Sequence, residues 1–320
     1  MSTVLVTGAA GFIGSATTKA LLDDGHEVVG IDCLTDYYDT RIKSAALESI
    51  PCDRFTFVPA DLLGTDLDAL LRGVDRVVHL AGQPGVRSSW GSDFELHTSR
   101  NVLATQALLE AARRSSHIER FVYASSSSVY GNALSHPTPE TATPQPVSPY
   151  GVTKLAGEHL ARLYASNYGV PTTSLRYFTV YGPGQRPDMA FARFTRAAVL
   201  GDEISLFGTG AQVRDFTYVD DVVRANLAAL FGDSEPGAVF NVAGGSNVSM
   251  NEVIATLGDL VGEPLAVRRH GTVAGDVFRT GGCTAAITAQ LGWRPRVSLA
   301  DGLERHLDSA RRSFAPLVAA

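Results

Sequence analysis

The feature that most constrains the fold of this chain is a cluster of glycines near its N-terminus. Gly8, Gly11 and Gly14 stand between a predicted strand at residues 3–7 and a segment at residues 13–21 whose apolar side chains recur at helical spacing. In such a strand–turn–helix unit, the first glycine allows a tight turn, the second lets the backbone approach a pyrophosphate, and the third lets the helix pack closely. Asp32 ends the second predicted strand, 18 residues after Gly14. This spacing predicts a dinucleotide-binding unit.

Short apolar segments alternate with segments of helical periodicity through the first half of the chain. They predict strands at residues 3–7, 27–32, 55–58, 76–80, 121–125 and 172–177, and a helix at 219–231 with a strand at 239–242 follows later. This alternation predicts an α/β fold, namely a Rossmann-like doubly wound parallel sheet with a smaller C-terminal substrate-binding lobe. We expect residues 1–179 and roughly 215–245 to form the cofactor-binding domain, and residues 180–214 and 246–320 to form the lobe.

The composition narrows the choice of partners. The net charge is −6, whereas nucleic-acid and anionic-membrane surfaces favour clustered Lys and Arg. No apolar segment reaches the ~18 residues of a membrane span, and no targeting signal is recognised. The three cysteines, Cys33, Cys52 and Cys283, are widely spaced, and the histidines form no metal-binding pattern. We therefore expect a cytoplasmic protein with no nucleic-acid, membrane or metal partner.

Asp32 also indicates which dinucleotide is bound. A carboxylate at this position accepts hydrogen bonds from the ribose hydroxyls and repels a 2′-phosphate, and the next residue is Cys33 rather than arginine, so NAD is favoured over NADP. Two further strand ends, Asp61-Leu62 and Ala81-Gly82-Gln83, are expected to close over the adenine and the rest of the cofactor.

A tyrosine and a lysine four residues apart, Tyr150 and Lys154, indicate acid–base chemistry. They lie on one face of a predicted helix that begins with Ser148 as N-cap and Pro149 in the first turn. A lysine ammonium near a tyrosine hydroxyl favours the phenolate, so the tyrosine can act as a general base near neutral pH. The strand at residues 121–125 runs into four consecutive serines, at the edge where parallel sheets bind ligands. Each motif alone also fits a polar turn or a solvated helix face, but together they favour a catalytic site.

Three motifs together resemble a known family. The glycine turn, Ser125-Ser126-Ser127-Ser128-Val129-Tyr130-Gly131 and Tyr150-Gly151-Val152-Thr153-Lys154 resemble, in this order and spacing, the extended short-chain dehydrogenase/reductase family of nucleotide-sugar epimerases and dehydratases. The resemblance covers essentially the whole chain. It implies that Ser126 is the catalytic hydroxyl, Tyr150 the base, Lys154 the lysine on the nicotinamide ribose and Asn101 the structural asparagine. It also implies a homodimer through helices near residues 101–113 and 150–168.

The residues that follow Ser126 separate the chemistries of this family. Sugar 4,6-dehydratases resemble one another in carrying Asp-Glu there, and decarboxylases of nucleotide-linked glucuronate carry Glu. This chain has Ser127 and Ser128, which leaves epimerisation at C4 through a transient 4-keto intermediate. Local sequences at residues 32–39, 85–87 and 176–189 resemble the UDP-glucuronate 4-epimerase branch, so the expected reaction is UDP-glucuronate to UDP-galacturonate. A UDP-glucose or UDP-N-acetylglucosamine 4-epimerase, a dehydratase or decarboxylase with atypical residues, and a non-catalytic NAD-binding sensor remain alternatives.

The resemblance and the residues together define a candidate site. The UDP-sugar is expected to contact Arg87, Ser126, Ser127, Ser128, Thr179, Arg186, Phe207, Arg214 and Asp276. Among these, Ser127, Ser128, Thr179 and Arg186 are the nominated donors to a uronate carboxylate, although Arg186 also fits a loop residue paired with Asp188. NAD is expected to contact Gly8, Gly11, Phe12, Ile13, Gly14, Asp32, Asp61, Leu62, Leu80, Ala81, Gly82, Gln83, Asn101, Ala124, Tyr150, Lys154 and Tyr177.

Overall fold

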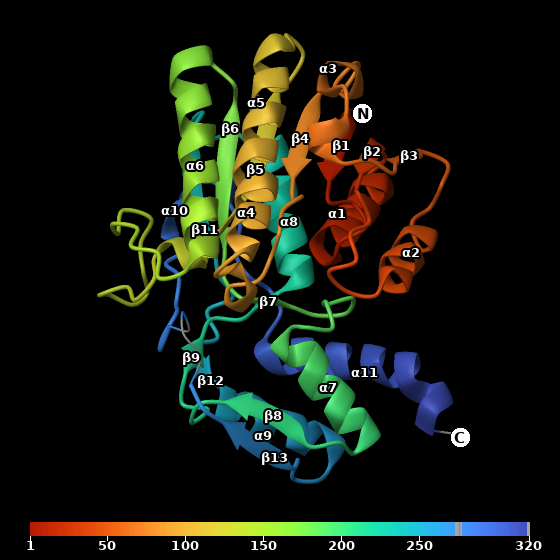
Figure 1. Ribbon diagram of the computed structural model, residues 1–320, viewed down its shortest axis with the longest axis vertical. Coiled ribbons are helices and arrows are strands. Elements are labelled where there is room, and N and C mark those ends of the chain that lie inside the picture. The colour runs from red at the N-terminus through yellow and green to blue at the C-terminus, as the bar shows by residue number, and fades with distance from the viewer. Residues whose placement is uncertain (273–274, 276, 319–320) are drawn as a thin grey trace.

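Seven parallel strands form the central sheet of the computed structural model, which describes residues 1–272, 275 and 277–318 (Figure 1). Their order across the sheet is β11-β6-β5-β4-β1-β2-β3. The six strands predicted in the first 180 residues are all present, with ends within one residue of those expected. The prediction of a doubly wound parallel sheet is therefore confirmed. The strands are β1 (Thr3–Thr7), β2 (Glu27–Ile31), β3 (Phe55–Val58), β4 (Arg76–His79), β5 (Arg120–Ser126), β6 (Thr172–Tyr177) and β11 (Ala238–Val242).

Helices cover both faces of this sheet (Figure 1). One face carries α5 (Ala104–Arg114) and α6 (Pro149–Tyr168), with the short α3 (Leu67–Leu70) beside α5. The other carries α1 (Phe12–Asp23) and α8 (Val219–Phe231), which pack against each other. α2 (Thr40–Glu48) lies near α1, and α4 (Asp93–Thr98) runs through a π-helical turn, Ser99–Leu103, into α5.

The strands are buried on both faces because successive side chains point to opposite sides. Leu5 of β1 packs in the core under α5 and α6, whereas its neighbours Val4 and Val6 pack in the core under α1 and α8. The core under α1 and α8 continues into the smaller lobe, where it includes Phe191 and Leu257. Burying one such side chain fully contributes about 1.5–3 kcal/mol, so this shared core fixes the lobe against the sheet.

The smaller lobe is built around α7 (Ala190–Leu200), which packs against α9 (Met250–Val261) and α11 (Leu299–Val318). Beside these helices, β8 (Ile204–Phe207) pairs in parallel with β13 (Val267–His270). Two short pairs join the lobe to the sheet region, β7 (Val180–Tyr181) with β10 (Thr217–Tyr218) and β9 (Val213–Arg214) with β12 (Val248–Ser249). The chain returns to the sheet through α8 and β11, and α10 (Ala285–Leu291) packs on β11. It therefore crosses between the two parts several times.

Local signals explain where α6 begins and ends. Ser148 is its N-cap, because its Oγ accepts a hydrogen bond of 3.1 Å from the N–H of Gly151, and Pro149 occupies the first turn. Gly169 ends the helix with φ +70°. The helix also lies close to the sheet, since a Cβ on Gly157 would fall 2.1 Å from the Tyr123 hydroxyl. The start of α6 therefore places Tyr150 at the end of β5.

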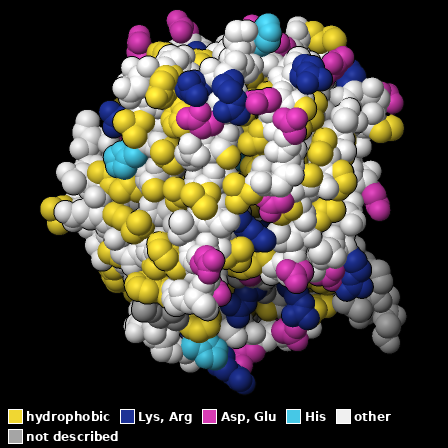
Figure 2. All heavy atoms as spheres, turned by 45° about the horizontal axis from the view of Figure 1, so that its top comes forward, with side chains coloured by type: hydrophobic (Ala, Val, Ile, Leu, Met, Phe, Trp, Pro, Cys, Tyr) yellow, Lys and Arg dark blue, Asp and Glu magenta, His cyan; other side chains and the backbone are white. Residues whose placement is uncertain are grey.

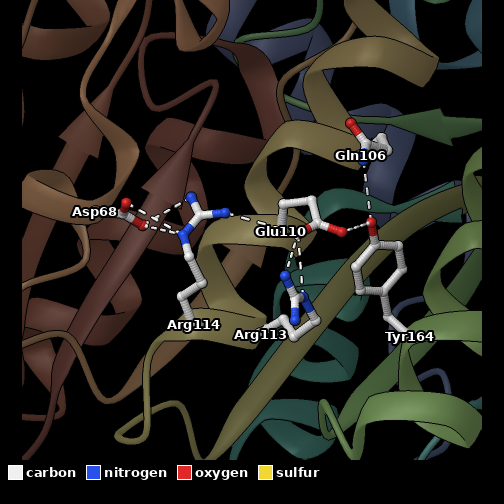
Figure 3. A network of polar contacts seen from close by, with 6 residues as sticks. All are labelled: Asp68, Gln106, Glu110, Arg113, Arg114 and Tyr164. Carbon is white, nitrogen blue, oxygen red and sulfur yellow. Dashed lines mark hydrogen bonds and ion pairs between the residues drawn. The ribbon is translucent and has the colours of Figure 1, made fainter.

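A network of polar contacts on the surface connects α3, α5 and α6 (Figure 3). Arg114 of α5 pairs with Asp68 of α3 at 2.9 Å. Glu110, also on α5, accepts hydrogen bonds from Arg113 and from the hydroxyl of Tyr164 on α6. These exposed contacts contribute little to stability individually, but they hold α5 and α6 in register.

The surface carries charges of both signs. Acidic and basic side chains are mixed with hydrophobic ones over the face seen in Figure 2. Within the described part of the chain, no helix is both long and apolar enough to cross a membrane. Among the same residues, no group of three or more His, Cys, Asp or Glu side chains is arranged to hold a metal ion.

Candidate active site

A cavity of about 240 Å³ opens at the carboxyl ends of the central strands. It lies where the strand order reverses between β1 and β4, the position at which open α/β sheets bind ligands. Most of the expected cofactor residues line it. They are Gly8, Gly11, Phe12, Ile13, Gly14, Asp32, Asp61, Leu62, Leu80, Ala81, Gly82, Gln83, Ala124, Tyr150, Lys154 and Tyr177.

The glycine turn forms the floor of this cavity. Gly8 has φ +71°, a conformation that favours glycine. A Cβ on Gly14 would lie 2.0 Å from the carbonyl oxygen of Gly8, so only glycine lets α1 begin this close to β1. Gly11 is the N-cap of α1 and brings no side chain to the first-turn N–H groups. Such a helix N-terminus attracts phosphate oxygens.

Asp32 lies at the end of β2 and is held by backbone donors. Its carboxylate accepts hydrogen bonds from the N–H groups of Ala10, at 3.2 Å, and Leu34, at 2.8 Å. The ammonium group of Lys43 lies 4.0 Å from the same carboxylate and donates to the Thr35 hydroxyl. Both charged side chains are buried, and Lys43 also lines the cavity. Sequence reasoning missed Lys43, since a single lysine gives no signal of its own.

Asn101 does not line the cavity but supports its wall. It is buried in the π-helical turn, accepts a hydrogen bond of 2.6 Å from the Gln83 N–H, and donates to the Gln83 carbonyl and to Thr153 on α6. The neighbouring Arg100, which the sequence analysis did not single out, lines the cavity and donates to the Gln83 side chain at 2.8 Å. The turn after β4 is thus fixed to α6 through Asn101.

A buried chain of hydrogen bonds runs from the glycine turn to the π-helical turn. Leu80 and Ala81 donate their N–H groups to Thr7 Oγ1, so the Thr7 hydroxyl must donate to Nδ1 of His79, 2.8 Å away. The neutral imidazole then carries its proton on Nε2 and donates to Thr105, whose hydroxyl donates to a backbone carbonyl in the π-helical turn. Burial lowers the pKa of His79 to about 3, which keeps the ring neutral.

Tyr150, Ser126 and Lys154 lie together at the end of β5. The hydroxyl of Tyr150 is hydrogen-bonded to the side chain of Ser126, and Ser126 also accepts from the N–H of Ser128 at 3.1 Å. Lys154 is buried one helical turn below, where its ammonium group donates to the carbonyl of Ala124 at 2.9 Å. The arrangement supplies a hydroxyl pair beside a buried cation, which suits proton exchange with a substrate hydroxyl.

Several groups act on the pKa of Tyr150. Burial raises the pKa of Tyr150, while its hydrogen bond with Ser126 and the positive charge of Arg186 lower it. Lys154 lies one helical turn away, where we expected a cation, and Arg186 adds a second positive charge that lowers the pKa of Tyr150. Burial lowers the pKa of Lys154 to about 8, because the ammonium group has no carboxylate partner among the described residues.

A second cavity of about 170 Å³ adjoins the serine-rich turn. Five of the expected substrate residues line it, namely Arg87, Ser127, Ser128, Thr179 and Arg214. The guanidinium of Arg214 donates to the carbonyls of Val277 and Phe278, so it fixes the segment that closes this cavity. The structure thus collects hydroxyl groups and two cations in one place, a combination that suits a polar, anionic ligand.

Four expected substrate residues are not among those that line the second cavity. Ser126 lies in the cluster with Tyr150 described above. Phe207 lines neither cavity, but the guanidinium of Arg87 stacks over its ring with 4.5 Å to the centroid. Asp276 lies outside the described residues. Arg186 lines the first cavity rather than the second, and it forms the ion pair with Asp188, with two contacts of 3.0 Å. The loop pairing that the sequence left open is therefore present.

His97 is a further residue that the sequence analysis missed. Its ring is buried on α4 and lies edge-on to the ring of Tyr150, with 6.0 Å between centroids. Burial lowers its pKa. A lone histidine gives no signal in the sequence, because the contact depends on how α4 packs against α6.

Comparison with known proteins agrees with this geometry. The model of the NAD-dependent epimerase/dehydratase family matches residues 4–243. A Bacillus subtilis protein named as an uncharacterized UDP-glucose epimerase is 42% identical over 95% of this chain and 96% of its own length. The UDP-glucuronate 4-epimerase of Thermodesulfobacterium geofontis is 34% identical, covering 98% of each chain. The crystal structure of the Bacillus cereus UDP-glucuronic acid 4-epimerase with UDP-glucuronic acid and NAD superposes with a TM-score of 0.94 at 42% identity, covering 98% of this chain and all of that one.

Proposed function

The chain belongs to the NAD-dependent epimerase/dehydratase family, and we propose that it is an NAD-dependent 4-epimerase that converts UDP-glucuronate to UDP-galacturonate. The observation that carries the proposal is the cluster of Tyr150, Ser126 and Lys154 at the end of β5, next to a cavity floored by the glycine turn. Relatives that cover nearly its whole length and are named for this activity support it.

The residues of the first cavity fit NAD. Gly8, Gly11 and Gly14 line this cavity without side chains, and a Cβ on Gly8 would lie 2.9 Å from the Ala81 backbone nitrogen, so the turn admits no side chain at its first glycine. The N-terminus of α1 suits the pyrophosphate, and the carboxylate of Asp32 suits the hydroxyls of the adenosine ribose. NAD, when bound, supplies a reversible hydride acceptor for C4 of the sugar.

The residues of the cluster have separate tasks in this proposal. Tyr150 takes the proton of the C4 hydroxyl and returns it, and Ser126 holds the same oxygen by a hydrogen bond. The ammonium group of Lys154 lies in the cavity wall, where it binds ribose hydroxyls and adds positive charge beside the reacting oxygen. Arg186 lowers the pKa of Tyr150 and so makes the phenolate more accessible.

The side chains that follow Ser126 favour epimerisation over elimination. Ser127 and Ser128 line the second cavity and place hydroxyl groups where a dehydratase or decarboxylase needs carboxyl groups. With no carboxylic acid at either position, nothing there protonates a leaving hydroxyl. The ketone formed at C4 therefore returns to an alcohol.

We assign the sugar as a uronate because its C5 carboxylate suits the donors available. Ser127, Ser128 and Thr179 line the second cavity, and Arg186 lies near Tyr150 between Tyr37 and Asp188. UDP-glucose is the second candidate, since the Bacillus subtilis relative carries that sugar in its name. The two sugars differ only in the group on C5, so Arg186 is the residue that separates them.

A single assay tests the proposal. The purified protein receives UDP-glucuronate, UDP-glucose or UDP-N-acetylglucosamine in separate reactions, and NMR follows the C4 epimer. We expect UDP-galacturonate from the first, with NAD retained on the protein and no steady accumulation of NADH. Conversion of UDP-glucose alone would reassign the substrate, and continuous NADH formation would exclude an epimerase.

We also propose a homodimer formed by α5 and α6, in a cytoplasmic protein. Exposed apolar side chains on this face support the dimer, among them Leu103, with 52% of its surface exposed, and Leu163, with 54%. The free cysteines support a reducing compartment. Light scattering tests the dimer, and a monomer would refute it. We assign cofactor binding to residues 1–179 and 215–245, and sugar binding to residues 180–214 and 246–320.

A further inference from the structure

A buried ion pair lies directly below the proposed catalytic cluster. Arg176 on β6 donates to the carboxylate of Glu158 on α6 through Nε, at 2.9 Å, and through Nη2, at 2.5 Å. The side chains are 4% and 1% exposed, respectively. Glu158 follows Lys154 by one helical turn and Tyr150 by two, so all three lie on the same side of α6.

Each partner of this pair makes a second contact toward the site. Glu158 accepts a hydrogen bond of 2.8 Å from the hydroxyl of Ser125, the residue before Ser126. Arg176 donates through Nη1 to the hydroxyl of Tyr130, at 2.7 Å, in the turn that follows the serines. The pair is therefore bonded to both sides of the Ser126–Ser128 segment.

The network continues to the loops around the second cavity. The Tyr130 hydroxyl donates to Asn241 Oδ1 at 2.8 Å. The amide of Asn241 donates to the carbonyls of Thr138, at 2.9 Å, and Cys283, at 3.2 Å. Cys283 lies just beyond Thr280, which lines the second cavity.

Stability alone does not account for a buried ion pair at this place. Removing two charges from water costs several kcal/mol per ion, and well-packed hydrophobic residues of similar volume are often as stable or more stable. What the pair supplies that hydrophobic residues lack is fixed direction, because a forked guanidinium and a carboxylate bond in one geometry.

We propose that Arg176 and Glu158 are positioning residues: they fix Ser126 relative to Tyr150 and Lys154 and connect that geometry to the loops at residues 138 and 283. The proposal rests on the proposed epimerase function. Neither residue lines either cavity, so each acts through Ser125 and Tyr130 rather than on the sugar.

The test compares variants that lose one member of the ion pair, a variant in which both members are replaced, and a control variant at an exposed ion pair. Glu158→Gln and Arg176→Met each leave one member of the pair without its partner, and the double variant Glu158→Met with Arg176→Met replaces both by apolar side chains. The control is Asp68→Asn, which breaks the exposed pair between α3 and α5. The readouts are the melting temperature, kcat and KM for the UDP-sugar that the wild-type protein converts.

We expect the single variants to lose both melting temperature and kcat. In the double variant the melting temperature returns toward that of the wild type, but kcat stays roughly ten- to a hundredfold low, because a misplacement of ~1 Å at a reacting centre costs about that much. KM changes little, and the control keeps both kcat and melting temperature. Recovery of kcat together with stability would show that the pair is only structural and overturn the proposal.

A smaller change keeps the proposal testable if the double variant does not fold. Tyr130→Phe removes only the hydroxyl that joins Arg176 to Asn241, and we expect a lower kcat with a smaller loss of melting temperature than in the single variants of the pair. An unchanged kcat in this variant would refute the connection to the loops. Failure of the wild-type protein to epimerise any UDP-sugar would instead refute the proposed function.

Discussion

Substitution of Arg186 separates two effects of its guanidinium. The side chain is paired with Asp188 at 3.0 Å, and its charge lowers the pKa of Tyr150. In the proposed reaction it also binds the substrate carboxylate. Arg186→Lys keeps the positive charge but loses the planar fork, whereas Arg186→Gln loses both.

The expected magnitude follows from the contact that each variant removes. A hydrogen bond to a charged group contributes about 1.5–3 kcal/mol, so kcat/KM for UDP-glucuronate should fall about 10- to 150-fold in Arg186→Lys. UDP-glucose carries a neutral hydroxymethyl group on C5 and should keep its kcat/KM within roughly a factor of three. The fold should persist, because an exposed ion pair such as that with Asp188 contributes about 0–1 kcal/mol.

The pH profile distinguishes the effect of charge from that of the fork. Tyr150 must lose its proton to act as a base, and loss of the Arg186 charge raises its pKa. The acidic limb of kcat/KM should therefore move to higher pH for both sugars in Arg186→Gln, but stay in place in Arg186→Lys. Above that limb, UDP-glucose activity should recover in Arg186→Gln while UDP-glucuronate activity stays low.

Initial rates by NMR across a pH series measure these effects. The same spectra report leakage of a UDP-pentose, which forms when a poorly held 4-keto uronate loses CO₂. Asp188→Asn is the control, since it removes the competing carboxylate and should leave uronate turnover undiminished. Equal losses for both sugars in Arg186→Lys, with no UDP-pentose, would refute the carboxylate contact and leave Arg186 as a loop residue.

Three further predictions follow from the first cavity. The pKa of Lys154 is lowered to about 8 in the folded protein, so between pH 8 and pH 10.5 the unfolded chain binds more protons than the folded one. Lys154→Met should abolish turnover because the ammonium group is lost. It should also raise the unfolding free energy below pH 8, and in urea titrations this gain should fade toward pH 10.5. Asp32→Ala removes the carboxylate that would repel the 2′-phosphate of NADP and leaves the ammonium group of Lys43 in place. The ratio of NADP affinity to NAD affinity should therefore rise by at least about tenfold in calorimetric titrations. Asn101→Ala leaves the buried N–H of Gln83 without its acceptor and should cost about 1–3 kcal/mol of unfolding free energy by the same urea method, a loss that would be absent if water replaced the side chain.

The sheet and the glycine turn were predictable because backbone geometry alone selects their residues. A positive φ at Gly8 and the close contact at Gly14 admit only glycine, and the position of Asp32 at the end of β2 follows from the length of one strand–helix–strand unit. Likewise, Ser148 and Pro149 place the start of α6 to within one residue.

Contacts between distant segments were not predictable in the same way. Lys43 reaches Asp32 only because α2 packs beside α1, and His97 meets Tyr150 only through the packing of α4 on α6. The charge acting on Tyr150 was assigned to Lys154 because the two are neighbours on one helix. The sequence did not reveal the further positive charge of Arg186, which lowers the pKa of Tyr150 and comes from a loop in the other half of the chain.

Because β11 occupies the edge of the sheet, the outer edge of β6 stays unpaired for a long stretch of protein synthesis. β6 ends at Tyr177 and β11 begins only at Ala238, after α7, β8 and α8 have been made. At about 5–20 residues per second, the ribosome needs roughly 3–12 s to supply the covering strand. During that interval the nascent chain presents a row of free peptide groups along a strand that is fully buried in the folded protein, the kind of edge that recruits other chains. A ribosome-bound chain of this length is therefore a natural client for chaperones, and a gene truncated near residue 180 should yield aggregates rather than an autonomous cofactor-binding domain.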